Sequence, residues 1–469
     1  MKSISFSAKS LKLHWLDFCT FTNMRLTLLI VFFVALSCKY EKYEPAANKV
    51  PLAECIDGHA KFTIDGKEYE YECNGYDLMG YVSLDEMNAE SGNDCWGWTD
   101  SQTGKEYALM GLDNGTAIVD ISIPTDPLYL GKIFTNGDPN DRGKAWRDLK
   151  VYNDYAFIVS EIAEHGMQVF DLTKLRTVDS FQNFDADYIY NGYGHAHNIA
   201  INTDSGYAYT LGAGNRSNVV GIHALNIQDP TSPVLELQLP DFGYTHDAQI
   251  INYSGPDSDH VGKEIYVGSN ENKLVFVDVT DKNNPELISE FFYDDTQYTH
   301  QTWLTEDHNY ALLGDELDEL DMSSNPIVLK DNIRTRTVVI DIKDLDNPIL
   351  HFDFRSDTES AIDHNGYVVG SKYFLASYTS GLRVIDIINI EQKSFKEIGF
   401  FDTHTDDHDH NIALESTPRW SDPGDHTGKK GAEIQAFNGA WSVYPFFKSE
   451  NIIISDINSG LFIVKKSNN

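Results

Sequence analysis

Short apolar runs with an aspartate or asparagine at the fourth position recur along the chain. Six runs resemble one another: Ala117–Ile121, Gln168–Leu172, His223–Ile227, Val275–Val279, Val338–Ile342 and Arg383–Ile387. A seventh apolar run, Leu461–Val464, lies near the C-terminus. The acidic or amide position advances by 51, 55, 52, 63 and 45 residues. A repeat of this length is typical of a unit built from four short strands.

The residues around each run also favour strands. Most runs are followed by a turn that contains Asp and Pro and then by a further apolar stretch, such as Val234–Leu239 or Leu287–Phe292. Two further β-rich stretches precede each run, for example His197–Asn202 and Tyr207–Ala213. No helical periodicity of any length is present. The pattern therefore predicts an all-β protein.

Seven four-stranded units can close into a propeller or stack into an elongated array. Closure leaves no long free sheet edge. The last apolar run lies where it can complete a blade begun by the N-terminal part of the chain. We therefore predict a seven-bladed β-propeller of four-stranded blades.

The N-terminal region has the features of an export signal. Leu26–Leu36 is an apolar stretch that follows Arg25 and precedes Cys38, and it is too short to span a bilayer. It resembles a bacterial lipoprotein signal in which Cys38 carries the lipid. An uncleaved anchor or a simple secretory signal is the alternative, and Met24 is a possible start besides Met1. Each version sends the protein out of the cytoplasm, so we expect a lipid-anchored protein of the cell envelope.

These features divide the chain into four parts. We expect a signal segment over 1–38, a tether over 39–54, a cysteine-containing segment over 55–93 and the propeller over 94–469. Cys55 and Cys73 flank a hairpin-like stretch, and in an oxidising compartment we expect them to form a disulfide. Cys95, next to Trp96, is then expected to be free and buried.

Composition limits the partners. The formal net charge is −36, and 41% of the residues are hydrophobic, so the chain can bury a large core. So acidic a surface repels phosphate backbones and anionic lipid headgroups and favours cations. We expect no nucleic-acid partner and no membrane contact except through the lipid anchor.

Histidines occupy equivalent places in four consecutive units. Each lies where an innermost strand begins: His197, His246, His300 and His364. Further polar residues are expected near the same mouth of the channel: Glu161, His165, His195, Asp247, Asp315, Glu316 and Asp363. Imidazole suits Zn, Cu, Fe or Ni, and carboxylates suit Mn or Ca. The four histidines are therefore candidate ligands of a divalent transition metal or of calcium, and the other residues are candidates for the second shell.

A purely structural role is the alternative. A histidine at this place can bind an aspartate of a neighbouring loop and lock the blade. Asp247 and Asp363, beside His246 and His364, are suited to that role. A metal site instead requires imidazole nitrogens from different blades to point at one place.

Several other acidic segments are present. Residues 403–435 interrupt the spacing with Asp and His, as a solvated loop or as a lid with an accessory cation site. Residues 321–332 form a second insertion. The stretch Asp257–His260 lacks the spacing of a calcium-binding loop and is expected to be a turn.

Rare motifs recur in an order similar to that of the choice-of-anchor B proteins, whose repeated core resembles the LVIVD repeat of bacterial surface proteins. The motifs are Trp96–Asp100, Trp146–Asp148, His165–Asp171, Ala196–Ile199, Tyr244–Gln249, Tyr298–Gln301, Gly314–Leu320, Ile362–Asn365 and Asn438–Pro445. The resemblance covers residues 55–464. It implies a β-propeller displayed at the cell surface, and it implies no reaction.

Three functions fit these features. The first is a non-enzymatic platform that binds an unidentified surface ligand or protein. The second is a metal-dependent enzyme in which Glu161, Asp315 or Glu316 acts as a base beside the four histidines. The third is a structural spacer of the envelope. No phosphate-binding loop, G-x-S-x-G motif or H-E-x-x-H motif points to another catalytic class.

Overall fold

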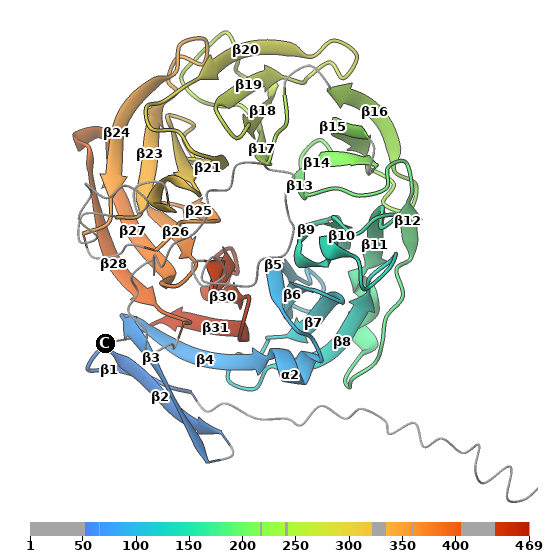
Figure 1. Cartoon of the computed structure of the whole chain (residues 1–469), viewed down its shortest axis with the longest axis vertical. Helices are drawn as coiled ribbons and strands as arrows, with labels where there is room; N and C mark the ends of the chain where they lie inside the picture. Colours follow the sequence, from blue (N-terminus) through green and yellow to red (C-terminus); the bar gives the residue numbers. More distant parts are fainter. Residues whose placement is uncertain are drawn as a thin grey trace, which may run out of the picture. The chain divides into compact units, whose positions relative to one another are not determined.

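The strands of this protein are arranged in antiparallel sheets around one axis (Figure 1). The computed structural model describes residues 52–64, 66–215, 218–239, 243–320, 334–357, 361–404 and 437–468. Cys38 and the rest of the expected signal segment lie outside these residues, as do 39–51 of the tether, the expected insertion over 321–332 and residues 405–435 of the other insertion. In the described ranges, no helix combines the length and the apolar character that a membrane span requires.

Six of the sheets have four strands each. In chain order they are β5 (Gly92–Thr99), β6 (Glu106–Leu112), β7 (Gly115–Asp120) and β8 (Leu128–Phe134); β9 (Arg147–Tyr152), β10 (Tyr155–Ser160), β11 (Met167–Asp171) and β12 (Tyr188–Tyr190); β13 (Asn198–Asn202), β14 (Tyr207–Asn215), β15 (Asn218–Asn226) and β16 (Val234–Leu239); β17 (Asp247–Asn252), β18 (Glu264–Ser269), β19 (Leu274–Asp278) and β20 (Glu286–Phe291); β21 (Thr299–Leu304), β22 (Tyr310–Asp315), β23 (Arg336–Asp341) and β24 (Ile349–Arg355); and β29 (Ala440–Tyr444), β30 (Asn451–Asp456) and β31 (Gly460–Lys466) with β4 (Tyr76–Ser83). Figure 1 shows β5, β9, β13, β17 and β21 nearest the axis.

The remaining sheet has seven strands. Its inner part is β25 (Gly366–Val369), β26 (Lys372–Ser377), β27 (Gly381–Asn389) and β28 (Ser394–Phe401), and β3 (Lys67–Asn74), β2 (His59–Ile64) and β1 (Cys55–Ile56) follow outward. Short helical segments of the described residues include α2 (Leu84–Met87) and the 3₁₀ turns η1 (Arg142–Ala145), η2 (Leu172–Thr177) and η4 (Ile390–Gln392). The all-β propeller with four-stranded blades is therefore present. The prediction of four strands in every blade is wrong for this sheet, because the N-terminal hairpin pairs with its outer edge.

The repeated Asp or Asn has a local structural role. In all six runs its side-chain Oδ1 accepts the backbone N–H two residues further on, as in Asp120 to Ser122 at 3.0 Å and Asn226 to Gln228 at 3.1 Å. In five of the six runs this Asx turn ends the third strand of the blade and turns the chain toward the fourth, whereas β27 continues past Asp386 to Asn389. The apolar residues before it are buried on both faces of the sheet, as throughout β7, because blades cover it on either side.

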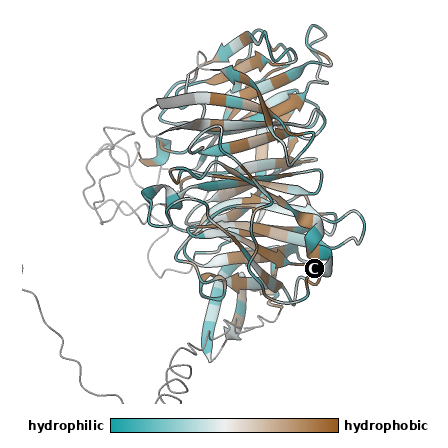
Figure 2. Cartoon of the chain, turned by 90° about the vertical axis from the view of Figure 1, so that its right-hand side faces the viewer, coloured by the Kyte–Doolittle hydropathy of each residue, from teal (hydrophilic) through white to brown (hydrophobic). Residues whose placement is uncertain are grey.

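Blades pack face to face through these apolar residues. One buried cluster combines Tyr209 and Ala224 of one sheet with Ile250, Val275 and Val277 of the next. In Figure 2 the hydrophobic colour runs along the strands, whereas many connecting turns are hydrophilic. The core of the propeller is therefore a series of layers between adjacent blades.

Hydrogen bonds near the axis also join neighbouring blades. Asp148 Oδ2 accepts the N–H of Ile199 at 2.8 Å. Gln249 Oε1 accepts the N–H of Leu304 at 2.9 Å, and Gln301 Oε1 accepts the N–H of Gly366 at 2.8 Å. The bonds to Ile199 and Gly366 place the start of one inner strand against the preceding one, and the bond to Leu304 places the end of β21 against β17.

The N-terminal part of the chain closes the ring. β4 pairs with the last strand, β31, in antiparallel register from Gly460↔Ser83 to Lys466↔Tyr76. The expectation of a separate segment over 55–93 is therefore wrong, because β1–β3 join one sheet, β4 joins another and β5 begins at Gly92. The expectation that the N-terminal chain completes the last blade is confirmed.

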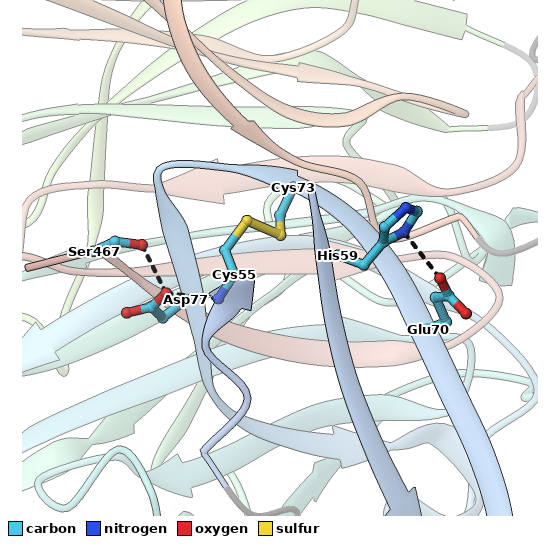
Figure 3. Close-up of a disulfide and its surroundings, with 6 residues drawn as sticks. All are labelled: Cys55, His59, Glu70, Cys73, Asp77 and Ser467. Carbon is cyan, nitrogen blue, oxygen red and sulfur yellow. Dashed lines mark hydrogen bonds and ion pairs between the residues drawn. A yellow bond between two sulfur atoms is a disulfide. The ribbon is translucent and has the colours of Figure 1, made fainter. Parts of the chain in front are cut away.

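A disulfide holds the hairpin beside this closure. Cys55 is bonded to Cys73, and Cys95 is free and buried. Asp77 Oδ1 accepts the N–H of Cys55 at 2.9 Å and the hydroxyl of Ser467 at 2.6 Å (Figure 3). The first strand is thereby joined to the C-terminal end of the chain.

Candidate functional site

The four predicted histidines come together from four consecutive blades. His197, His246 and His364 lie just before β13, β17 and β25, and His300 lies in β21. The ring centroids are separated by 4.3 Å from His197 to His246, 4.2 Å from His246 to His300 and 4.3 Å from His300 to His364. The imidazoles therefore form a continuous arc, which we call the histidine arc.

The backbone at these positions is fixed by the blade. The N–H of His197 bonds the carbonyl of Leu211, and the N–H of His246 bonds the carbonyl of Ser269. Each contact pairs the entry to an inner strand with the second strand of the same sheet. Equivalent positions on successive blades are held in this way at equivalent places around the axis.

Three of the four rings are anchored through Nδ1. The acceptors are Glu161 Oε1 for His197 at 2.6 Å, the carbonyl oxygen of His300 for His246 at 3.2 Å, and the carbonyl oxygen of Trp441 for His364 at 2.5 Å. Because each acceptor is an oxygen, each Nδ1 carries the hydrogen. The Nε2 of each ring is then left with a lone pair when the ring is neutral. This arrangement is typical of histidines that bind a metal through Nε2.

Two Nε2 atoms lie very close together. His197 Nε2 and His246 Nε2 are 2.7 Å apart. Two lone pairs at that distance repel, so a proton or a cation must lie between them. Two ligands of one metal at right angles would be about 3 Å apart for metal–nitrogen bonds of about 2.1 Å.

His300 is the least satisfied of the four. Its side chain is 2% exposed, and neither ring nitrogen has a hydrogen-bond partner among the described residues. A buried polar group without a partner costs about 1–3 kcal/mol. An ion that used one of these nitrogens as a ligand would offset that cost.

Glu316 faces the second half of the arc. Its carboxylate oxygens lie 3.7 Å from His300 Nε2 and 3.6 Å from His364 Nε2. Tyr378 donates its hydroxyl to Glu316 Oε1 at 2.7 Å. One ligand atom each of His300, Glu316 and His364 lies within 4.8 Å of the other two, so this trio has the composition and spacing of a metal site.

Burial dominates the electrostatics of the arc. Burial, together with the neighbouring imidazoles, lowers the pKa of His246 and of His300 well below the usual value. Burial likewise lowers the pKa of His364 to about 4. These three rings are therefore neutral near pH 7, which is the form that binds metals.

His197 and Glu316 behave differently. Burial opposes the charged form of His197, but the hydrogen bond and the negative charge of Glu161 outweigh it and raise its pKa. A proton on its Nε2 then satisfies the close contact with His246. Burial raises the pKa of Glu316 to about 7, so this carboxyl is near its midpoint at neutral pH.

The predicted Asp–His locks are not formed. The Oδ1 of Asp247 accepts the N–H of Ala248 at 2.6 Å. Asp363 is 1% exposed, and its two oxygens have no hydrogen-bond partner among the described residues. The alternative role, in which an aspartate binds each histidine and locks the blade, therefore does not account for the placement of His246 and His364.

Other predicted residues have separate structural roles. Asp315 accepts the hydroxyl of Tyr293 at 2.8 Å and the N–H groups of Gln297 and Tyr298 at 2.8 and 2.7 Å, so it shapes the loop before His300. His195 lies two residues before His197, and its backbone N–H donates to the carbonyl of Gly214 at 3.0 Å.

His165 belongs to another group. Its Nδ1 bonds the carbonyl of Gly166 at 3.0 Å, and its Nε2 lies 3.0 Å from Nη1 of the buried Arg147. With the hydrogen on Nδ1, Nε2 accepts from the guanidinium. The assignment of His165 to the second shell of the arc is therefore wrong, because its Nε2 accepts a hydrogen bond from the guanidinium of Arg147.

Four residues of the channel were not among the predicted site residues. Tyr378 and the carbonyl of Trp441 position Glu316 and His364. Lys150 and Asp94 form an ion pair with an Nζ–Oδ2 distance of 3.3 Å. Lys150 could have been found from the sequence, because it lies two residues after Asp148 on the same inner strand.

A second group of potential ligands lies elsewhere. Asp257, His260 and Asp346 have ligand atoms within 4.8 Å of one another. Asp257 already accepts N–H groups from Asp259 at 3.1 Å and from Leu345 at 3.0 Å. The group thus joins two turns, in agreement with the expected turn over Asp257–His260.

Comparison with known proteins supports the repeat. The family model described as the LVIVD repeat matches residues 105–135 and 261–292. These stretches contain β6–β8 and β18–β20, the outer three strands of two blades. The chain therefore carries LVIVD repeats. No curated protein matches the chain.

Solved structures resemble the chain only distantly. A nidogen/laminin complex has a TM-score of 0.38 and 9% identity, covering 64% of this chain and 93% of that chain. Hydrazine synthase of Kuenenia stuttgartiensis has a TM-score of 0.46 and 10% identity, covering 77% and 93%. The β-propeller domain of Myceliophteria thermophila Cps50 (Swd1) has a TM-score of 0.45 and 9% identity, covering 81% and 97%. None of them carries a conclusion about function.

The buried His165–Arg147 contact predicts an acid-sensitive step in stability. Burial and the charge of Arg147 lower the pKa of His165 to about 3. Between about pH 6.5 and 3 the unfolded chain binds a proton at His165 that the folded chain does not, so this group destabilises the fold as the pH falls. The unfolding free energy of the wild type should fall as the pH falls. We expect H165Q to reduce this slope against pH by about 1.4 kcal/mol per pH unit near pH 5. Urea unfolding from pH 4 to 7 measures this slope, with H59Q as the control, because the side chain of His59 is 38% exposed and lies away from Arg147. Equal slopes for H165Q and the wild type would contradict the assignment.

Proposed function

We propose that this protein is a binding scaffold whose ligand at the channel mouth is a divalent transition-metal ion. The observation that carries the proposal is the anchoring of three rings of the histidine arc through Nδ1, which leaves the Nε2 lone pair of each neutral ring available to an ion. His300 adds a buried imidazole with no partner among the described residues. LVIVD repeats on a propeller support the scaffold part of the proposal.

The donor set favours a transition metal over calcium. His197, His246, His300 and His364 would supply nitrogens, and calcium prefers oxygen ligands. Glu316 lies where it can complete the coordination or accept a proton. In the metal-free protein a proton on His197 takes the place between two Nε2 atoms, so binding of an ion there releases it.

A metal-dependent enzyme is the second candidate function. Glu316 favours it, because a carboxyl with a pKa of about 7 beside two neutral imidazoles is suited to proton transfer near neutral pH. Loss of a metal-dependent activity in E316Q, with metal content retained, is the result that would separate this candidate from a binding role alone.

The first test is metal content. We expect protein purified without chelator, or reloaded after chelation, to hold about one transition-metal ion per chain. H300Q/H364Q should lose at least about 10-fold in affinity, because two nitrogen ligands are removed. The control H59A/H351A changes histidines outside the arc and should retain the ion. Elemental analysis and competition with a chromophoric chelator measure both quantities. A wild-type protein that takes up no ion, or a double variant that binds as tightly, would reject the metal site.

The second test concerns the anchor of His197. We expect E161Q to weaken metal binding by about 10- to 100-fold, since second-shell carboxylates orient and polarise ligating histidines. E164Q, an exposed change in the same loop, is the matched control. The same chelator competition provides the measurement, with circular dichroism to show that both variants are folded. Unchanged affinity in E161Q would place the ion away from His197.

We also propose that the propeller is attached to the cell envelope through a lipid on Cys38, as the similarity to choice-of-anchor B proteins implies. Leu26–Leu36 and the following Cys38 support this location. We expect C38S to move the protein from the membrane fraction to the soluble fraction of the cell. Fractionation of cells that express each form measures the change. Membrane association retained by C38S would indicate an uncleaved anchor instead.

A further inference from the structure

A buried tyrosine hydroxyl holds one oxygen of the carboxylate that faces the histidine arc. Tyr378 is 2% exposed, and its hydroxyl donates to Glu316 Oε1 at 2.7 Å. The other oxygen, Oε2, lies 3.7 Å from His300 Nε2, which is longer than a hydrogen bond. The two oxygens of Glu316 are therefore in different situations, because one accepts from a phenol and the other faces an imidazole.

The position of Tyr378 is set by its own backbone and by ring packing. The residue directly follows β26 and forms a bridge with Ala440 of the next blade, whose N–H donates to the Tyr378 carbonyl at 2.8 Å. Its ring centroid lies 4.8 Å from that of His364 and 5.4 Å from that of Phe437. The hydroxyl is thus directed at Glu316 by contacts between two blades, without help from an ion.

Glu316 and the imidazole of His364 present acceptors to each other. The Nδ1 of His364 donates to the carbonyl of Trp441, so a lone pair lies on its Nε2. This Nε2 is 3.6 Å from Glu316 Oε1. Two ligands of one ion with bonds of about 2.1 Å lie about 3.4–3.6 Å apart at angles of about 110–120°. The spacing therefore fits a cation shared by the carboxylate and the imidazoles.

The hydrogen bond from Tyr378 limits how the carboxylate can bind an ion. Because Oε1 already accepts the hydroxyl, Oε2 is the oxygen that remains for the ion. One carboxylate oxygen beside imidazole nitrogens is a mixed ligand set. Carboxylates suit Mn²⁺, and imidazole suits Fe and Zn. Zn²⁺ takes four ligands in most protein sites, so an oxygen added to four imidazoles contributes little to its binding.

We infer that Tyr378 is a positioning residue that sets the metal preference of the histidine arc. It holds Glu316 as a ligand that binds through one oxygen, and it thereby raises the affinity for Mn²⁺ and Fe²⁺ relative to Zn²⁺. The inference rests on the proposed function, because it requires an ion in the arc. It adds the class of ion and the residue that selects it.

The first test is the ratio of Mn²⁺ to Zn²⁺ affinity in Y378F, which removes the hydroxyl and retains the ring. We expect the Mn²⁺ affinity to fall about 10-fold, because the carboxylate loses the partner that orients it. The Zn²⁺ affinity should change by less than about 3-fold, since four imidazoles suffice for this ion. Competition with a chromophoric chelator, after removal of bound metal, measures both affinities. A purely structural role would weaken both ions alike, and that result or an unchanged ratio overturns the inference.

Two further variants test whether Tyr378 acts through Glu316. E316Q keeps the shape of the side chain and removes its charge, so it should lower the Mn²⁺ affinity at least about 10-fold. Y378F added to E316Q should then leave the ratio of affinities unchanged. A further fall in this double variant overturns the inference, because the hydroxyl would then act through another contact.

The matched control is Y209F. Tyr209 is also fully buried, and its hydroxyl donates at 2.9 Å to a glutamate of the neighbouring blade, Glu264, which lies outside the arc. We expect the ratio of affinities in Y209F to equal that of the wild type. A ratio that falls as far in Y209F as in Y378F overturns the inference, since loss of any buried tyrosine hydroxyl would then suffice.

Folding of each variant is checked by circular dichroism. If Y378F does not fold, E316Q decides the question, because an unchanged ratio in folded E316Q overturns the inference. Failure of the proposed function gives a different result. A wild-type protein that takes up no ion rejects both proposals, whereas an ion in the arc with the same ratio in E316Q and Y378F rejects only the role of Tyr378.

Discussion

The antiparallel pairing of β4 with β31 is the constraint on which the rest of the structure depends. It joins the N-terminal chain to the last strand and closes the ring of sheets. Closure places the inner strands around one axis, so residues from separate repeats face one another. Hydrogen bonds such as Asp148 to Ile199 and Gln301 to Gly366 hold neighbouring inner strands in position. Without closure, His197 and His364 would lie on unrelated surfaces.

Burial gives the channel its chemistry. Water is excluded from the four imidazoles, so their charged forms are disfavoured and only His197, beside Glu161, is stabilised as a cation. A few residues away, the same exclusion of water strengthens the attraction between Lys150 and its carboxylates. The neutral imidazoles suit a transition metal, whereas Lys150 and Asp94 form an internal ion pair.

The local elements were predictable because they follow from short-range rules. The apolar runs are buried third strands, and in five of the six the Asp or Asn forms the Asx turn at the end of the strand. The four histidines could be placed near one another because they lie at the start of equivalent strands. The pairing of β1–β3 and of β4 with two different sheets was not predictable, since strand pairing between distant segments leaves no periodic pattern in either one. The contact of His165 with Arg147 was missed for the same reason.

By itself, the sequence determined the strand periodicity, the repeat and the positions from which imidazoles enter the channel, because each depends on residues close together in the chain. Only the tertiary structure decided which atoms meet. Which acceptor each Nδ1 takes, the approach of Glu316 to two rings, and the ion pair between Lys150 and Asp94 all depend on side-chain directions across separate blades. Those directions follow from packing around the axis, and packing is a property of the closed ring and not of any one repeat.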